Sequence, residues 1–107
     1  MSEIFALGQL LAQQAQGGRS YLEFLRIAAM SAGIYVLPVG AKDGQSPHNQ
    51  DEIYYVVSGT AKVRLGLEES RVEKGSVIFV KAGLQHRFFD VEEELVLLVV
   101  FAPAEQG

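Results

Sequence analysis

The sequence predicts an all-β domain, a sandwich or barrel of short strands, with one short helix at its N-terminus. From Ser20 onward, runs rich in β-branched and aromatic residues recur at short intervals, and Gly- or Pro-containing turns separate them. The segment 60–67 alternates apolar and polar side chains, which is typical of a half-buried strand. Apolar residues recur at helical spacing only near the N-terminus. Together these patterns indicate about eight short strands.

Each predicted strand ends at a residue that disfavours further pairing. Pro38 and Gly40 stop the run "GIYVLPVG", the pair Ser58-Gly59 closes "EIYYVVSG", and Pro103 ends the last run. The expected strand regions are 20–28, 33–38, 52–57, 60–67, 71–74, 76–80, 86–91 and 94–102.

The helix is expected in an N-terminal extension, residues 1–19, that packs on the main domain. Leu7, Leu10 and Leu11 fall on one helical face, and Gly17 and Gly18 supply the flexible stop that helix ends favour. The β-barrel itself is expected over residues 20–107.

Composition excludes several functional classes. The chain has 107 residues, 49 % of them hydrophobic and 21 % charged, with a net charge of -4 and no cysteine. Its cationic residues form no stripe, which argues against a nucleic-acid partner. The longest apolar run, Leu95 to Ala102, is too short for a membrane helix, and the N-terminus lacks the basic start of a signal peptide. We therefore expect a cytoplasmic protein with no membrane partner.

Three predicted strands are apolar on both faces, at 53–57, 77–80 and 95–101. A sheet with one face in water should alternate instead. Either a second copy of the chain or the N-terminal helix covers the outer face, and both can hold. The sequence thus predicts a homodimer.

The chain has two histidines, and each lies near the start of a predicted strand. His48 and Glu52 stand at the entrance to one apolar strand, and His86 precedes another. Strand ends in a small barrel can converge at one mouth. Two imidazoles and one carboxylate form a ligand set that suits Fe(II), Mn(II), Ni(II) or Zn(II) and leaves open positions for water or substrate.

These residues carry a resemblance to the cupin family, whose members have two motifs, G-x5-H-x-H-x3-4-E-x6-G and G-x5-P-x-G-x2-H-x3-N. Residues 40–59 match the first motif in spacing and residues 75–90 match the second, without a gap. The resemblance implies a jelly-roll barrel, the double-stranded β-helix, that binds a divalent metal at its mouth. It departs from the pattern at three positions, which are Ser46, Lys81 and Asp90.

The resemblance places metal ligands at His48, Glu52 and His86, whereas Ser46 stands where the family has its first histidine. A neutral hydroxyl is a poor ligand, so metal affinity should be lower than at a four-ligand site. Water is the simplest occupant of the fourth position. Gln50 ranks next as an auxiliary ligand, and Ser46 itself is the remaining candidate.

Four aromatic residues are expected to line a pocket for a small-molecule ligand beside the metal: Tyr35, Tyr54, Phe79 and Phe88. Tyr54 shares strand parity with Glu52, and Phe88 shares it with His86, so both should point inward. Tyr54 is also a candidate proton donor. They could equally be plain barrel core, since the inward face of a small barrel is both core and pocket wall.

Three functions remain open at this point. A metal-dependent enzyme would bind a small anionic or chelating molecule, and the cupin resemblance implies dioxygenase or isomerase chemistry. A non-catalytic protein would bind a small molecule with or without metal. A structural cupin would keep the fold around a decayed, metal-free site.

Overall fold

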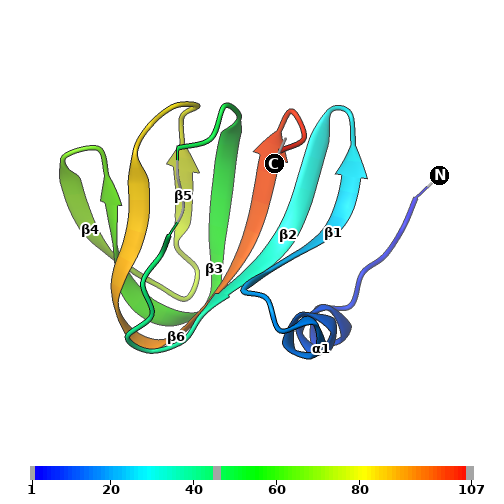
Figure 1. Ribbon diagram of the computed structural model, residues 1–107, viewed down its shortest axis with the longest axis horizontal. Helices are drawn as coiled ribbons and strands as arrows, with labels where there is room; N and C mark the ends of the chain where they lie inside the picture. Colours follow the sequence, from blue (N-terminus) through cyan, green and yellow to red (C-terminus); the bar gives the residue numbers. More distant parts are fainter. Residues whose placement is uncertain (1, 45–46, 106–107) are drawn as a thin grey trace.

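The computed structural model describes residues 2–44 and 47–105 and contains one helix and six strands within them (Figure 1). Among the described residues, no helix combines the length and apolar character that crossing a membrane requires. The elements follow one another along the chain as α1 (Leu7–Gly17), β1 (Tyr21–Ile27), β2 (Met30–Leu37), β3 (Asp51–Leu65), β4 (Glu68–Glu73), β5 (Val77–Val80) and β6 (His86–Ala102).

The strands form one antiparallel sheet that folds back on itself. Its order is β1-β2-β6-β3-β4, and β5 pairs with the first part of β3. The first part of β3 pairs with the last part of β6, and the end of β3 pairs with the beginning of β6. The two halves of these long strands therefore lie in two layers, as Figure 1 shows. This is the all-β double-stranded β-helix that the sequence predicts.

Two pairs of strands that we expected to be separate are continuous. Residues 52–57 and 60–67 largely form the single strand β3, and 86–91 and 94–102 form β6. The predicted turn at Ser58-Gly59 is instead a bend within β3, where the register with β6 shifts. Gly59 has a φ of 95°, and a Cβ there would collide with the backbone of Glu94 on β6. The glycine thus bends the sheet without ending the strand.

The main core fills the space between the two layers. It combines the inward residues of β3 and β6, such as Val56, Val63, Leu95 and Leu97, with side chains from the other strands. All four are essentially inaccessible to solvent. Because inward side chains alternate along each strand, this core also determines which residues can face a site at the end of the barrel.

Helix α1 covers only part of the outer face of the sheet. Leu10 packs with Ile34, Val36 and Val96 of β2 and β6, and the helix ends at Gly17, followed by Gly18 with a φ of 71°. The outer face of β3 and β5 lies beyond it: Ile53, Tyr55, Val77 and Phe79 are all exposed. The helix predicted at the N-terminus is confirmed, and an apolar surface remains next to it.

Candidate metal centre

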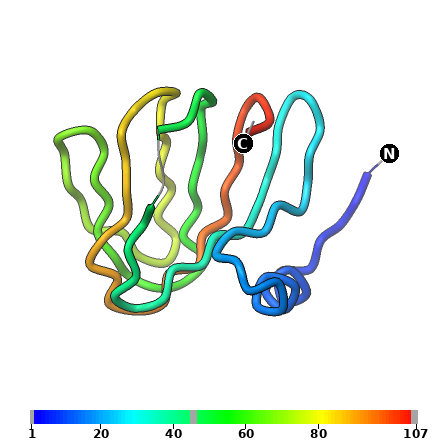
Figure 2. The backbone as a smooth tube through the Cα atoms, viewed as in Figure 1, coloured from blue at the N-terminus to red at the C-terminus, as the bar shows by residue number. Residues whose placement is uncertain are grey.

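Three side chains with metal-ligating atoms converge at one end of the barrel. His48 lies in the segment between β2 and β3, Glu52 is near the start of β3, and His86 begins β6. One ligand atom from each lies within 4.8 Å of the others. The start of β3 and the turn between β5 and β6 lie at the same end of the molecule in Figure 2, which brings these distant residues together.

Backbone contacts hold the segment that carries His48. The Gly83 N–H donates to the His48 carbonyl at 2.7 Å, and the Ala82 N–H donates to Asp51 Oδ1 at 2.8 Å. Both donors lie in the turn that leads to His86. The turn between β5 and β6 thus fixes the chain on either side of His48 and Glu52 against the element that presents His86.

A backbone carbonyl fixes the orientation of the His86 ring. His86 Nδ1 lies 2.9 Å from the carbonyl oxygen of Leu84. A carbonyl can only accept, so Nδ1 carries the proton and the neutral ring presents a lone pair at Nε2. This is the arrangement that orients metal-ligating histidines in proteins.

The Nε2 atom of His86 points at the carboxylate of Glu52, at 3.0 Å from Oε1, and both side chains are only 1 % exposed. Neither oxygen of Glu52 accepts a hydrogen bond from the part of the chain that the structure describes. With the neutral tautomer of His86, two acceptors face each other. Only a proton on Nε2 or a cation between the two groups makes this contact favourable.

The surroundings of His86 act on its pKa in opposite directions. Burial lowers the pKa, but the close contact with Glu52, the hydrogen bond to the Leu84 carbonyl and the charges of Glu52 and Asp43 raise it more. The net pKa is raised above its ordinary value. The site therefore attracts positive charge, which is a proton when no metal competes for Nε2.

His48 is the most accessible of the three candidate ligands. Its Nε2 lies 3.9 Å from Glu52 Oε1, and its side chain is 19 % exposed. Its ring packs edge-on against Phe101, with the ring centroids 4.9 Å apart. Of the three ligand side chains, this one is the most open to solvent.

Three of the four predicted pocket residues lie at this end of the barrel. The Tyr54 hydroxyl is 3.1 Å from His86 Nε2, and Phe88 packs edge-on against the Tyr54 ring. Tyr35 lines a cavity beside His48 and donates a hydrogen bond to Asp43 Oδ1 at 2.7 Å. Asp43 also accepts from the backbone N–H of Phe88.

Phe79 is a correction to the sequence analysis, because its side chain is 60 % exposed on the outer face. Strand β5 is apolar at every position, so its sequence offers no alternation from which to read the inward face. The structure turns Ile78 and Val80 inward instead. Ser46 lies outside the described residues. Gln50 is buried in the bend before β3, and its role as an auxiliary ligand stays a prediction.

The structure brings to this site two further residues, Tyr21 and Glu105, that the sequence did not indicate. Glu105 follows the last strand, and its Oε1 lies 3.9 Å from His48 Nδ1. Tyr21, at the start of β1, joins Glu105 and His48 in lining a cavity of about 190 Å³. Neither residue belongs to a motif or a strand entrance near the histidines, so no sequence signal marks them.

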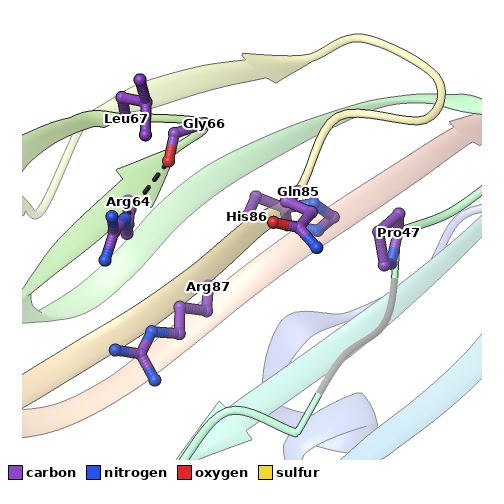
Figure 3. A pocket seen from close by; sticks show the side chains of 7 residues that line it. All are labelled: Pro47, Arg64, Gly66, Leu67, Gln85, His86 and Arg87. Carbon is purple, nitrogen blue, oxygen red and sulfur yellow. Dashed lines mark hydrogen bonds between the residues drawn. The ribbon is translucent and has the colours of Figure 1, made fainter.

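A second opening, of about 400 Å³, borders the site on the side of His86 (Figure 3). Arg64 and Arg87, which are directly opposite each other on β3 and β6, line it. Figure 3 shows Arg87 extending away from His86, and the Arg64 guanidinium donates to the carbonyl of Gly66. The two openings beside the three ligands therefore differ in charge.

The fold and the double motif define the class of protein, and sequence comparison agrees. The chain belongs to the cupin domain family, whose model matches residues 33–101. It is 48 % identical over 101 residues to an uncharacterized protein of Streptomyces coelicolor, an alignment that covers 94 % of this chain and 96 % of that protein.

Solved structures resemble the whole chain. The TT1209 protein of Thermus thermophilus superposes with a TM-score of 0.76 and 27 % identity, covering 96 % of this chain and 99 % of that one. BH2720 of Bacillus halodurans gives a TM-score of 0.79 with 17 % identity, covering 98 % of this chain and 85 % of that one. The second likeness concerns the fold alone.

Proposed function

We propose that this protein binds one divalent transition-metal ion through His48, Glu52 and His86 and a small organic ligand in the adjoining cavity. The observation that carries the proposal is the carboxylate of Glu52, which is buried without a hydrogen bond from the described chain and faces the lone pair of His86. Burying an uncompensated carboxylate costs several kcal/mol, and a bound cation offsets that cost.

The donor set fits the metal. Two imidazoles and one carboxylate suit Fe, Mn, Zn or Ni and leave positions for water and ligand. When bound, such an ion would polarise a ligand oxygen as a Lewis acid or, as iron, take part in oxygen chemistry, which are the requirements of isomerases and dioxygenases.

Two residues of the chain support this chemistry from their own positions. The bond from His86 Nδ1 to Leu84 keeps Nε2 unprotonated and directed at Glu52 when the ring is neutral. The Tyr54 hydroxyl, 3.1 Å from the same nitrogen, is buried beside the ligand set and can hold a proton or donate it to a molecule bound next to the metal. We propose Tyr54 as the acid-base group of the site.

Elemental analysis of the untagged protein, after incubation with Fe, Mn, Zn or Ni and removal of excess ions, tests the metal. We expect about one ion per chain in the wild type and a loss of at least about tenfold in His86→Ala. Arg87→Ala is the matched control, because its side chain points away from the site, and it should retain the ion. Absence of metal from the wild type with every ion would contradict the ligand assignment.

Glu52→Gln separates a metal site from a decayed one. In the metal-free protein, at a pH above the raised pKa of His86 where its ring is neutral, this change removes a buried charge that has no hydrogen bond from the described chain, so the free energy of unfolding should rise by about 1–2 kcal/mol. The same variant should no longer be stabilised by metal. If wild type and variant respond to metal alike in thermal melts, the metal-free alternative is correct. Oxygen uptake with diols and β-diketones then tests for dioxygenase activity.

A further inference from the structure

The cavity beside His48 has aromatic walls on most of its sides. Tyr21, Tyr35, His48, Val99, Phe101 and Glu105 line it. The rings of Tyr21 and Tyr35 meet edge to face with centroids 6.3 Å apart, and those of His48 and Phe101 do so at 4.9 Å. The volume of about 190 Å³ equals roughly that of six water molecules in the liquid, which is room for a compact ligand.

The position of the Tyr21 ring depends on a glycine. Tyr21 pairs with Tyr35 across β1 and β2, and its phenol ring extends over Gly33. A Cβ at Gly33 would collide with that ring, so only glycine lets Tyr21 occupy this place. The Tyr21 hydroxyl is buried and receives no hydrogen bond from the described part of the chain. Burial and then the nearby acids raise the pKa of Tyr21, so the phenol stays neutral.

The charged side chain that lines the cavity is an acid. Glu105 is the lining residue with a formal charge, and no lysine or arginine among the described residues lines the cavity. Arg26 is near enough to act on the pKa of Tyr21, and its guanidinium donates to both carboxylate oxygens of Glu23, at 3.0 and 2.7 Å, and to the backbone carbonyl of Glu105. The opening on the other side of the ligands, by contrast, has two arginines.

We propose that this cavity binds a compact organic cation of the methylated-ammonium class, with its charge against Glu105 and the aromatic rings of Tyr21, Tyr35 and Phe101. Aromatic faces attract cations through their quadrupoles, and a neighbouring carboxylate adds a Coulombic term. An anion in this cavity would be repelled by the Glu105 carboxylate. No lysine or arginine of the described chain lines the cavity to offset that repulsion. The inference deepens the proposed function by naming the ligand class beside the metal. The charge of a bound divalent ion would oppose a cationic ligand, so the full preference is expected in the metal-free protein, and the walls themselves need no metal.

Ligand-observed NMR with choline and its neutral isostere 3,3-dimethyl-1-butanol tests the charge preference. The two molecules share a shape, so a difference in affinity reports the charge. We expect the chelator-treated wild type to bind choline about tenfold more tightly than the alcohol. Equal affinity, tighter binding of the alcohol, or binding of neither would overturn the proposal.

Variants locate the site. Glu105→Gln should remove most of the preference for choline and leave binding of the alcohol unchanged, whereas Glu93→Gln, an exposed acid on β6, should keep both affinities. Gly33→Ala should weaken both ligands by displacing the Tyr21 ring. If Glu105→Gln and Glu93→Gln bind choline equally well, the cation does not occupy this cavity.

Measurements with and without a chelator keep this test apart from the metal test. Choline binding that Glu105→Gln weakens in chelator-treated protein would support the cavity even if no metal is retained. Metal retention without selective choline binding would leave the metal proposal standing and reject the cation.

Discussion

The two faces of strand β3 differ from the usual pattern in opposite ways, with a charged side chain buried on the inner face and apolar side chains exposed on the outer face. Its inward side chains at Glu52, Tyr54 and Val56 are almost completely buried, and the first of them is a carboxylate. Its outward neighbours Ile53 and Tyr55 are apolar and aromatic, yet they are 46 % and 40 % exposed. A charge thus lies inside and apolar groups lie outside, within five consecutive residues.

The comparison shows that burial, not polarity, follows the alternation of a strand. A buried charge is retained in proteins where it has a partner or binds an ion. Exposed apolar patches often mark interaction surfaces. The inner face of β3 therefore points to a cation, and the outer face points to a covering surface.

The largest expected effect on stability is a difference between two phenylalanines, Phe88 on the inner face of the sheet and Phe79 on its outer face. Phe88→Ala removes a ring buried against Tyr54 and should lower the free energy of unfolding by about 3–5 kcal/mol. Phe79→Ala removes an exposed ring and should cost less than about 1 kcal/mol. Urea denaturation at low protein concentration measures both. Similar losses would show that the two faces are equally buried.

A smaller expected effect is the pH dependence of stability that His86, next to Glu52 on the inner face, gives to the metal-free protein. The raised pKa of His86 means that its protonation adds stability, fully present below the ordinary imidazole value near 6.5. That contribution is lost as pH rises through the raised pKa. Metal-free protein should thus become less stable over this window as pH increases, and His86→Gln should lack that trend.

Metal should reverse the dependence, because protons compete with the ion for His86 Nε2. Thermal melts between about pH 5 and 9, with metal and with a chelator, measure both trends. The same slope in both conditions would mean that His86 does not bind the ion.

The smallest effect on folding should come from the outer face. Phe79→Glu should change the free energy of unfolding of a single chain by no more than about 0.5 kcal/mol, since the side chain is exposed. The homodimer stays a prediction from the sequence, and this face is where it would form. Analytical ultracentrifugation at micromolar concentration should give a dimer for the wild type and a monomer for Phe79→Glu. Leu67→Glu, exposed in the turn after β3, is the control. A monomeric wild type would contradict the prediction.

Much of the metal centre could be predicted because its spacing is local. Each candidate ligand lies a few residues from a turn, at the entrance to a strand. The spacing within each motif therefore predicts where the residue lies in the fold as well as what type of residue it is. The structure brings His48, Glu52 and His86 within ligand distance as those motifs imply. Tyr54 and Phe88 could be placed by parity, since regular strands alternate.

The inward-facing side chains could not be predicted where a strand is apolar at every position or where the chain forms no strand. The uniformly apolar β5 conceals that Phe79 faces outward. Glu105 follows Pro103, and its place beside His48 depends on the hydrogen bond from its own N–H to Ser31 Oγ on β2. Tyr21 reaches the cavity because of Gly33 on a neighbouring strand. Such contacts join segments far apart in the chain.

Strand patterns and motif spacing are properties of short segments, so the sequence was sufficient to predict the fold family, the helix and the three candidate ligand residues. The tertiary structure decided the charge and shape of the cavity beside them, because closing the sheet brings β1 and the C-terminal segment against His48. It also decided that α1 covers β1 and β2 and leaves the outer face of β3 and β5 open. Both outcomes depend on how separate elements pack, which no single stretch of sequence records.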